Sequence, residues 1–360
     1  MASKDESYDH PPDKNMRLNI LFIADVNNSA IATSSRAWKK IMGGDVLYSA
    51  NFLSPMQLLR AVSRKNPDII LFTWRGALSE ILKDSKSIKY LQTSFINSKI
   101  IFSVPDYLGL KPTSSDEQLL KFADGVTVVS ENLYAIYSQM NERIIPILVL
   151  RDLPDLNAIN KTMLQKVNKK SQVIWVGNSK WGEGLGYIDH KGFKRFIQPI
   201  FASLHKLDPK LETIAIDRGS KFIPLENTLE MIRNSKFLLQ FSDSEGTGLP
   251  IIEACGLGTI PITRDVGIAR ELLQGTLQQF IVTNADEALT RISNFKNNDI
   301  TEQLIKAYEN YIQKCISTIQ SIEFRNVPIR LAERKNFKVK TSVKNSLWIR
   351  LRWIYRFLRN

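Results

Sequence analysis

Two acidic residues flank a short glycine-containing loop in the stretch FSDSEGTGLPIIEACGLGTIPITRDVG, residues 241–267. Glu245 precedes Gly246 and Gly248, and Glu253 follows with seven residues between the two glutamates. Carboxylates can accept pairs of hydrogen bonds from vicinal hydroxyls, and glycines let a ligand approach the backbone closely. These residue types indicate a ligand that carries hydroxyl groups and, where a helix begins at the loop, a phosphate.

The stretch predicts a strand, a tight turn, a helix and a second strand. An apolar run ends at Phe241, and Pro250 fits the first helical position, where its missing N–H costs nothing. Glu253 then lies about one turn into the helix, and Glu245 lies at the carboxyl edge of the strand, where open parallel sheets bind ligands. An acid in a first helical turn can also only stabilise the helix dipole, which is the structural alternative for Glu253.

Short apolar runs alternate with helical patterns along the rest of the chain. The runs are NILFIAD, VLYSANF, DIILFTW, KIIFSV, GVTVVS and IIPILVL, then QVIWVG, LETIAI, KFLLQFS, GTIPITR and QFIVTN. The alternation predicts an α/β fold with two doubly wound parallel sheets in two Rossmann-like domains. Pro261, within GTIPITR, argues against a central strand there because proline removes a ladder hydrogen bond.

The 360 residues, 43% of them hydrophobic, are enough for two cores. We divide the chain into a disordered leader at 1–16, an N-terminal domain at 17–150, a linker at 151–171, a C-terminal domain at 172–300, a helix at 301–330 and a basic tail at 331–360.

Composition excludes several classes of protein. Cys255 and Cys315 are the only cysteines, and His10, His190 and His205 show no metal-ligand spacing, so we expect reduced thiols and no metal site. Cys255 is better explained as a buried packing residue than as a nucleophile. No apolar run approaches the roughly 18 residues of a transmembrane helix, and the charged start is unlike a signal peptide. We therefore expect a cytoplasmic protein.

The net charge of +13 is concentrated at the end of the chain. Residues 330–360 hold ten Lys or Arg against one acid, which leaves +4 for the other 329 residues. On a helix, Arg352, Arg356 and Arg359 fall within about 60° of one another, opposite an apolar face. Residues 343–360 therefore suit an anionic membrane interface, and packing across the domains is the alternative. We expect no nucleic-acid partner, because no recognised nucleic-acid motif accompanies the charge.

The stretch SEGTGLPIIEACGLGTIPITRDVG closely resembles the E-x₇-E motif of retaining, nucleotide-sugar-dependent glycosyltransferases with the GT-B fold, a family 4-like group also described as glycosyl transferases group 1. VIWVGNSKWG and HKGFKRFI are similar to segments of that family's C-terminal domain, and ADGVTVVSENL to the last strand and helix of its N-terminal domain. The resemblance implies two Rossmann-like domains facing a cleft, a nucleotide sugar as substrate without cofactor or metal, and a final helix that returns to the first domain.

Site residues follow from the resemblance. Glu245 would be catalytic, contacting the transferred sugar near its reacting face, Glu253 would bind the ribose, and Lys191 would pair with the diphosphate. A solvated surface lysine is the alternative for Lys191, and loop or packing roles are expected for His190 and Trp181. The other donor-binding residues would be Gly177, Asn178, Lys180, Gly246, Thr247, Gly248 and Leu249.

The chain departs from the family pattern at several positions. Asn178 stands where the family commonly has arginine, and Lys180 could supply that charge. Asp106 stands where a histidine is frequent and is a candidate catalytic or acceptor-side residue, with a turn cap as the alternative. Asn28 and Ser29 could line the acceptor pocket or cap a helix.

The sequence thus predicts a glycosyltransferase of polysaccharide biosynthesis. It would transfer a sugar, with retention, to a lipid-linked or membrane-proximal glycan acceptor while attached peripherally to the inner face of the membrane. A non-catalytic relative that keeps the GT-B scaffold as a binding module is the alternative.

Overall fold

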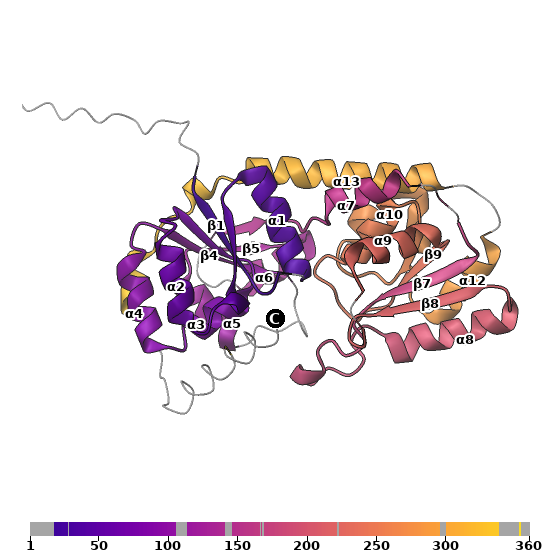
Figure 1. Ribbon diagram of the computed structural model, residues 1–360, viewed down its shortest axis with the longest axis horizontal. Helices are drawn as coiled ribbons and strands as arrows, with labels where there is room; N and C mark the ends of the chain where they lie inside the picture. Colours follow the sequence, from indigo (N-terminus) through magenta and orange to yellow (C-terminus); the bar gives the residue numbers. More distant parts are fainter. Residues whose placement is uncertain are drawn as a thin grey trace, which may run out of the picture.

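The computed structural model of the chain describes residues 18–27, 29–105, 114–140, 146–165, 167, 169–221, 223–295, 300–337 and 353. The predicted leader at 1–16 and most of the basic tail lie outside these residues. Two lobes, each built on one parallel sheet, make up the described part of the chain (Figure 1).

The first lobe contains a six-stranded sheet in the order β2-β1-β3-β4-β5-β6. Its strands are β1 (Ile20–Ala24), β2 (Asp45–Tyr48), β3 (Ile69–Phe72), β4 (Lys99–Val104), β5 (Gly125–Val128) and β6 (Ile147–Val149), and its helices are α1 (Ala30–Met42), α2 (Pro55–Ser63), α3 (Arg75–Ile81), α4 (Ser85–Ser94), α5 (Ser114–Phe122) and α6 (Glu131–Met140). Along β1, Ile20 and Phe22 join one apolar cluster, while Leu21 and Ile23 join the cluster on the other face. Because both faces are covered, the strand is apolar at every position.

The second lobe contains a four-stranded parallel sheet in the order β10-β9-β7-β8. Its strands are β7 (Gln172–Gly177), β8 (Glu212–Asp217), β9 (Phe237–Gln240) and β10 (Ile260–Thr263), and its helices are α8 (Gln198–Leu207), α9 (Leu225–Asn234), α10 (Leu249–Gly256), α11 (Ala269–Leu272) and α12 (Ala285–Asn294). β10 is at the end of the sheet, so Pro261 lies in an edge strand, where a missing N–H is tolerated. The strand predicted for QFIVTN is wrong, because that segment makes only an isolated bridge between Thr263 and Ile281.

The polar segment 151–171, which connects the two sheets, contains a helix, α7 (Leu156–Met163). Asp155 caps this helix by accepting a hydrogen bond from the N–H of Ala158 at 3.1 Å. A short π-helix, Phe193–Ile197, precedes α8.

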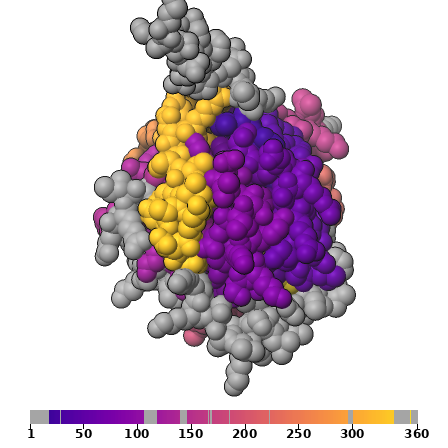
Figure 2. Space-filling view, turned by 90° about the vertical axis from the view of Figure 1, so that its left-hand side faces the viewer, coloured from indigo at the N-terminus to yellow at the C-terminus, as the bar shows by residue number. Residues whose placement is uncertain are grey.

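The long helix α13 (Thr301–Ser321) runs along both lobes and contacts α10 in the second lobe and α1 in the first (Figure 1). After α13 the chain continues over the first lobe to α14 (Leu331–Asn336), and Figure 2 shows this last described stretch, in yellow, lying against the indigo and purple first lobe. The two ends of the described chain therefore share one lobe.

A buried ion pair fixes the end of the chain to the first lobe. Arg334 and Asp124 pair with their side chains 1% and 0% exposed. Arg334 also donates to the carbonyl oxygens of Phe95 at 3.0 Å and Ser98 at 2.9 Å, and Asp124 accepts from the N–H of Ile100 at 2.7 Å. Each charge is thus satisfied by both an opposite charge and backbone groups, as burial requires.

We predict that Arg334→Leu lowers the free energy of unfolding by about 3–5 kcal/mol, because Asp124 is left buried without its partner. Urea unfolding followed by circular dichroism measures the change. Lys335→Leu, at an exposed neighbouring position of α14, is the matched control and should stay within about 0.5 kcal/mol. Equal stability of the two variants would show that the ion pair does not hold the chain end in place.

Candidate functional site

A cavity of about 820 Å³ lies where the carboxyl ends of the two sheets face each other. The first lobe contributes the loop after β1 and the start of α1, and the second contributes the ends of β7, β8 and β9 with the start of α10. Its lining includes Asp25, Asn27, Ser29, Thr33, Arg36, Asp152, Asp155, Gly177, Trp181, Lys191, Arg218, Gln240, Ser242, Glu245, Gly246, Thr247, Gly248, Leu249 and Glu253.

Glu245 and Lys191 form an ion pair in this cavity. Lys191 Nζ lies 2.6 Å from Glu245 Oε1, and the two side chains are only 17% and 15% exposed. Ser242 donates a second hydrogen bond to the same oxygen at 2.6 Å. Burial raises the pKa of the Glu245 carboxyl, but the Lys191 charge and the hydrogen bonds from Lys191 and Ser242 outweigh burial and place it below its ordinary value. Glu245 is therefore a fixed carboxylate.

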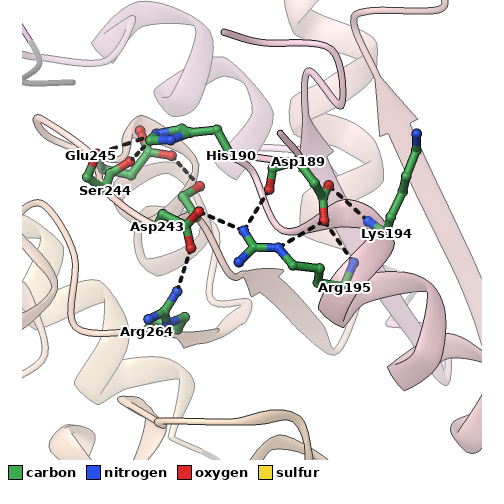
Figure 3. A network of polar contacts seen from close by, with 9 residues as sticks. Asp189, His190, Lys194, Arg195, Asp243, Ser244, Glu245 and Arg264 are labelled. Atoms are coloured by element: carbon green, nitrogen blue, oxygen red, sulfur yellow. Dashed lines mark hydrogen bonds and ion pairs between the residues drawn. The ribbon is translucent and has the colours of Figure 1, made fainter. Parts of the chain in front are cut away.

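A polar network orders the loop before Lys191 (Figure 3). Asp189 adopts a left-handed backbone conformation, with φ at 49°, and accepts hydrogen bonds from the N–H groups of Lys194 at 3.0 Å and Arg195 at 2.8 Å. Arg195 also contacts Asp243 at 2.6 Å, and Asp243 contacts Arg264 at 3.1 Å. The start of the π-helix and the loop after β9 are thus tied together.

His190 and Trp181 support the same arrangement. His190 Nε2 lies 3.1 Å from the carbonyl oxygen of Ser244, and its ring lies against Trp181 with centroids 4.6 Å apart. Lys191 Nζ lies 4.9 Å from the centroid of Trp181, within range of a cation–π interaction. Packing roles expected for Trp181 and His190 thus extend to positioning Lys191, and Trp181 itself lines the cavity.

The N-terminus of α10 opens onto the cavity. The helix begins at Leu249, one residue earlier than predicted, so Pro250 is its second residue rather than its first. Gly248 caps it with φ at 86°, a conformation that suits glycine. The N–H groups of Gly248 and Leu249 donate to no other described residue. They are available to an anion, as the prediction for this loop requires.

Glu253 lies on the cavity wall one turn along α10 and is 6% exposed. Burial raises the pKa of its carboxyl, and the charge of Asp155 adds to this effect while Arg218 opposes it. No hydrogen bond to the carboxylate comes from the described residues. A buried carboxylate with free acceptor positions is costly and calls for donors from a ligand.

Sequence reasoning missed several cavity residues, among them Arg36, Arg218 and Gln240. Arg218 follows β8, is exposed, and lines the cavity on the side that faces Glu253. Gln240 ends β9, is 5% exposed, and its Oε1 has no partner among the described atoms. For Arg218 and Gln240, the available signal was their position directly at the carboxyl end of a predicted strand.

Of the three donor-binding residues predicted in the turn after β7, only one lies in the described cavity lining. Gly177 lines the cavity, whereas Asn178 and Lys180 are absent from its described lining. Asn178 Oδ1 accepts from the N–H of Lys180 at 3.0 Å, and Ser179 donates to Asp217 at 2.6 Å, so these side chains stabilise the turn itself. Arg218, rather than Lys180, is a cation in the described lining of the cavity near this turn.

Direct contacts between the lobes close the cavity beside the glycine loop. Thr247 donates to Asp152 at 2.8 Å, across the connection from β6. A side chain at Gly246 would overlap the carbonyl group of Pro105 in the first lobe. Glycine is required there because two backbones meet, an additional reason beyond the predicted approach of a ligand.

Ser29 caps α1 by accepting from the N–H of Ala32 at 3.0 Å, as the helix-cap alternative expects. It also lines the cavity, and its role on the acceptor side stays a prediction. Its hydroxyl donates to Asp25. Asn28 and Asp106 lie outside the described residues. Among the described residues, no group of three or more His, Cys, Asp or Glu side chains could hold a metal ion, and no helix is both long and apolar enough to span a membrane.

The comparisons with known proteins agree on the architecture. Residues 203–314 match the family described as "Glycosyl transferases group 1". Anabaena Alr3699/HepE in complex with UDP and glucose is similar in structure, with TM-score 0.52, 14% identity, 85% of this chain and 100% of that chain covered. The trehalose-6-phosphate synthase OtsA has TM-score 0.53, 11% identity, and 85% and 99% covered.

TarM is matched with TM-score 0.47 and 13% identity over 70% of this chain, which spans about half, 54%, of the TarM chain. No curated protein gives a significant sequence match. At these identities the solved structures establish the fold, two Rossmann-like domains facing a cleft in the GT-B arrangement.

The opposite pKa directions of the two glutamates predict opposite effects on stability. For Glu253, the folded pKa lies above its ordinary value of 4.5, so the ionised form is less favourable in the fold than in the unfolded chain. Glu253→Gln should therefore raise the free energy of unfolding at pH 7, on the order of 1 kcal/mol, and the gain should vanish well below pH 4.5.

Glu245→Gln should do the reverse. Its folded pKa lies below 4.5, so the stabilisation is fully present above pH 4.5 and is lost as the pH falls through the folded pKa. Urea unfolding from pH 3 to 8 measures both variants. Shifts of the same sign at pH 7 would contradict the assignment of the two environments.

Proposed function

We propose that this chain, with its GT-B fold and its match to glycosyl transferases group 1 over residues 203–314, is a glycosyltransferase that transfers a sugar, with retention, from a nucleoside diphosphate sugar to a lipid-linked or membrane-proximal glycan acceptor. The observation that carries the proposal is the Glu245–Lys191 ion pair beside the open N-terminus of α10, opposite the unpaired carboxylate of Glu253.

This arrangement suits departure of a nucleoside diphosphate. Negative charge grows on the diphosphate as the glycosidic bond stretches, and fixed cations and N–H groups stabilise that charge more than the ground state. Lys191 and the N–H groups of Gly248 and Leu249 supply this from one wall, and Arg218 adds a second cation. The binding energy is thereby concentrated on the leaving group.

The two glutamates take different roles in the proposal. Glu253 accepts hydrogen bonds from the ribose diol, which would satisfy its free acceptor positions. Glu245, held ionised by Lys191, lies near the reacting face of the sugar and stabilises positive charge that develops at the anomeric carbon. Retention is supported by the resemblance of the E-x₇-E stretch to retaining enzymes.

A non-catalytic binding module is the second candidate. Asn178 favours it, because the residue that stands in place of the family's common arginine turns its oxygen to the N–H of Lys180 within its own turn. Both candidates would bind a nucleoside diphosphate, and only the transferase would break the sugar–phosphate bond.

We predict that the two glutamates separate binding from turnover. Glu253→Ala should weaken binding of the best-bound nucleoside diphosphate by about 10- to 100-fold, since two hydrogen bonds to a charged group are lost. Glu245→Gln should change that affinity by less than about threefold yet lower sugar transfer or donor hydrolysis at least about 100-fold. A thermal-shift screen of nucleotides and nucleotide sugars identifies the donor, and calorimetry and product assays give the two quantities.

Glu230→Gln, at an exposed position of α9 outside the cavity lining, is the matched control. A wild type that binds the nucleotide but turns over no donor with a broad acceptor panel would favour the binding module. Unchanged nucleotide affinity in Glu253→Ala would remove the ribose assignment.

The basic tail supports attachment to the inner, anionic face of a membrane. Residues 330–360 carry ten Lys or Arg against one acid, and Trp348, Trp353 and Tyr355 accompany them. Trp353 is the one described residue of segment 343–360; it is 1% exposed and belongs to the apolar cluster of the first lobe. The tail is therefore anchored to the lobe at Trp353, and attachment to lipid would rest on its charges.

We predict that replacing Arg352, Arg356 and Arg359 together by Gln weakens binding to phosphatidylglycerol-containing vesicles by about 100-fold at low salt, since each surface-proximal cation contributes about 1 kcal/mol. Vesicle sedimentation measures this, with pure phosphatidylcholine vesicles as reference. Deleting the tail would remove buried Trp353 and confuse the test. The control replaces three exposed cations of the body: Lys206, Lys210 and Lys221. Equal losses in both triple variants would show that net charge, not the tail, attracts the vesicles.

A further inference from the structure

Arg36 lies in the second turn of α1 and lines the cavity on the wall that the first lobe supplies. Its Nη1 donates to the backbone oxygen of Asn27 at 2.6 Å and to the side-chain oxygen of Asn27 at 3.1 Å, and lies 3.5 Å from the hydroxyl of Tyr48. Its Nη2 donates to Thr33 at 3.1 Å. The guanidinium is thus held in one place by groups from three separate elements.

Every one of these acceptors is neutral. No carboxylate among the described residues lies within ion-pair distance of Arg36, and its Nε–H is not used in any of the four contacts. A guanidinium has five N–H groups in a rigid plane, so further donors remain for a ligand. The side chain is half-buried and oriented, yet its charge is not neutralised.

The described lining of the cavity includes six acids, and none of them forms an ion pair with Arg36. Glu226 and Glu253 have no side-chain partner among the described residues, and the other four contact other residues. Asp25 accepts from Ser29, Asp152 from Thr247, and Glu245 pairs with Lys191. Asp155 caps α7. None of them is a counterion for Arg36. An anion from a ligand could therefore pair with its charge.

Arg36 is separate from the cations proposed for the donor. Lys191 and Arg218 belong to the second lobe with the N-terminus of α10, while Arg36 and its four acceptor atoms all belong to the first lobe. A substrate that reaches the donor across the cleft would meet Arg36 on the opposite wall. The N-terminus of α1 lies on the same wall through Ala30 and Ile31, and its first turn holds no acid.

We propose that Arg36 binds an anionic group of the acceptor, a phosphate ester or a carboxylate, and so selects negatively charged acceptors over neutral ones. The proposal rests on the proposed function, since it names the acceptor class of the same cleft. A bidentate guanidinium contact suits both anions because their oxygens lie in matching positions. The anion can belong to a water-soluble sugar phosphate or to a lipid phosphate, which share this chemistry.

The test uses full-length protein saturated with the nucleoside diphosphate that binds best, so that the donor site is occupied. The probes are matched pairs: glucose with glucose 6-phosphate, glucose with glucuronate, and a polyprenol with its polyprenyl phosphate in detergent micelles. Affinity is measured by thermal-shift titration and calorimetry. We expect at least one anionic probe to bind wild type roughly 10- to 100-fold more tightly than its neutral partner, as for hydrogen bonds to charged groups, and the pair that shows this identifies the soluble or lipid source.

Arg36→Gln should reduce that preference to within about twofold, while Arg36→Lys, which keeps the charge but loses the planar donors, should keep an intermediate preference. Lys40→Gln, at an exposed position of the same helix outside the cavity lining, should keep the wild-type preference. The melting temperature and nucleoside diphosphate affinity of each variant check that the fold and donor site are intact. If Arg36→Gln does not fold, the test is whether Arg36→Lys shows a weaker preference for the anionic probe than wild type does.

Three outcomes would overturn the proposal: no anionic preference in wild type, an unchanged preference in Arg36→Gln, or a loss of nucleoside diphosphate affinity in Arg36→Gln as large as the loss for the anionic probe. The last would place Arg36 in the donor site. Failure of wild type to bind any nucleoside diphosphate would instead refute the proposed function, and this inference with it.

Discussion

The ion pair between Lys191 and Glu245 depends on two loops that come from distant parts of the chain and must meet within hydrogen-bond distance. Both charges are largely withdrawn from water, so either one alone would be costly. The network of Asp189, Arg195 and Asp243 holds Lys191 and Glu245 close together, because it ties the loop before the π-helix to the loop after β9 (Figure 3). Arg195 and Asp243 are 46% and 40% exposed, so their ion pair contributes to orientation more than to net stability.

For Glu253, in contrast to Glu245, the effect of burial on the carboxyl is not outweighed by nearby charges or donors. It is buried on the cavity wall without a hydrogen-bond donor from the described residues, and its raised pKa records the resulting cost. A carboxylate kept in such an environment weakens the fold, and a ligand with hydroxyl donors would recover that energy on binding. The cost is small relative to the apolar cluster around α10, in which Ile251, Ile252 and Ala254 are fully buried. The fold can tolerate a local loss at this position because neighbouring apolar residues fix the helix.

The sequence was sufficient for the ten strands of the described chain, because central strands such as β1, β3 and β9 are buried on both faces and read as continuous apolar runs. It was also sufficient to bring Gly177, Lys191, Glu245 and Glu253 to one cavity: Gly177 and Glu245 lie at or just after strand ends, Glu253 lies one turn into the following helix, and Lys191 came from the family resemblance. It failed for QFIVTN, since an apolar run alone does not reveal whether a neighbouring strand is free to pair. Arg218 was missed although it lies directly at the carboxyl end of a predicted strand, and Arg36 was missed because it lies within a helix whose approach to the cleft has no local signal in the sequence.

Closure of the cleft follows from the same long-range contacts. The lobes touch where Gly246 meets Pro105 and where Thr247 donates to Asp152, directly beside Glu245. Since these contacts involve the glycine loop itself, a change in the angle between the lobes would move the backbone that cradles the ligand. The second lobe is attached to the first at two places. One is the connection that contains α7, and the other is α13, which contacts both lobes and continues to the part of the chain that Arg334 fixes to the first lobe. A cleft held in this way places one wall from each lobe around a single cavity, which is what a reaction between two separately bound substrates requires.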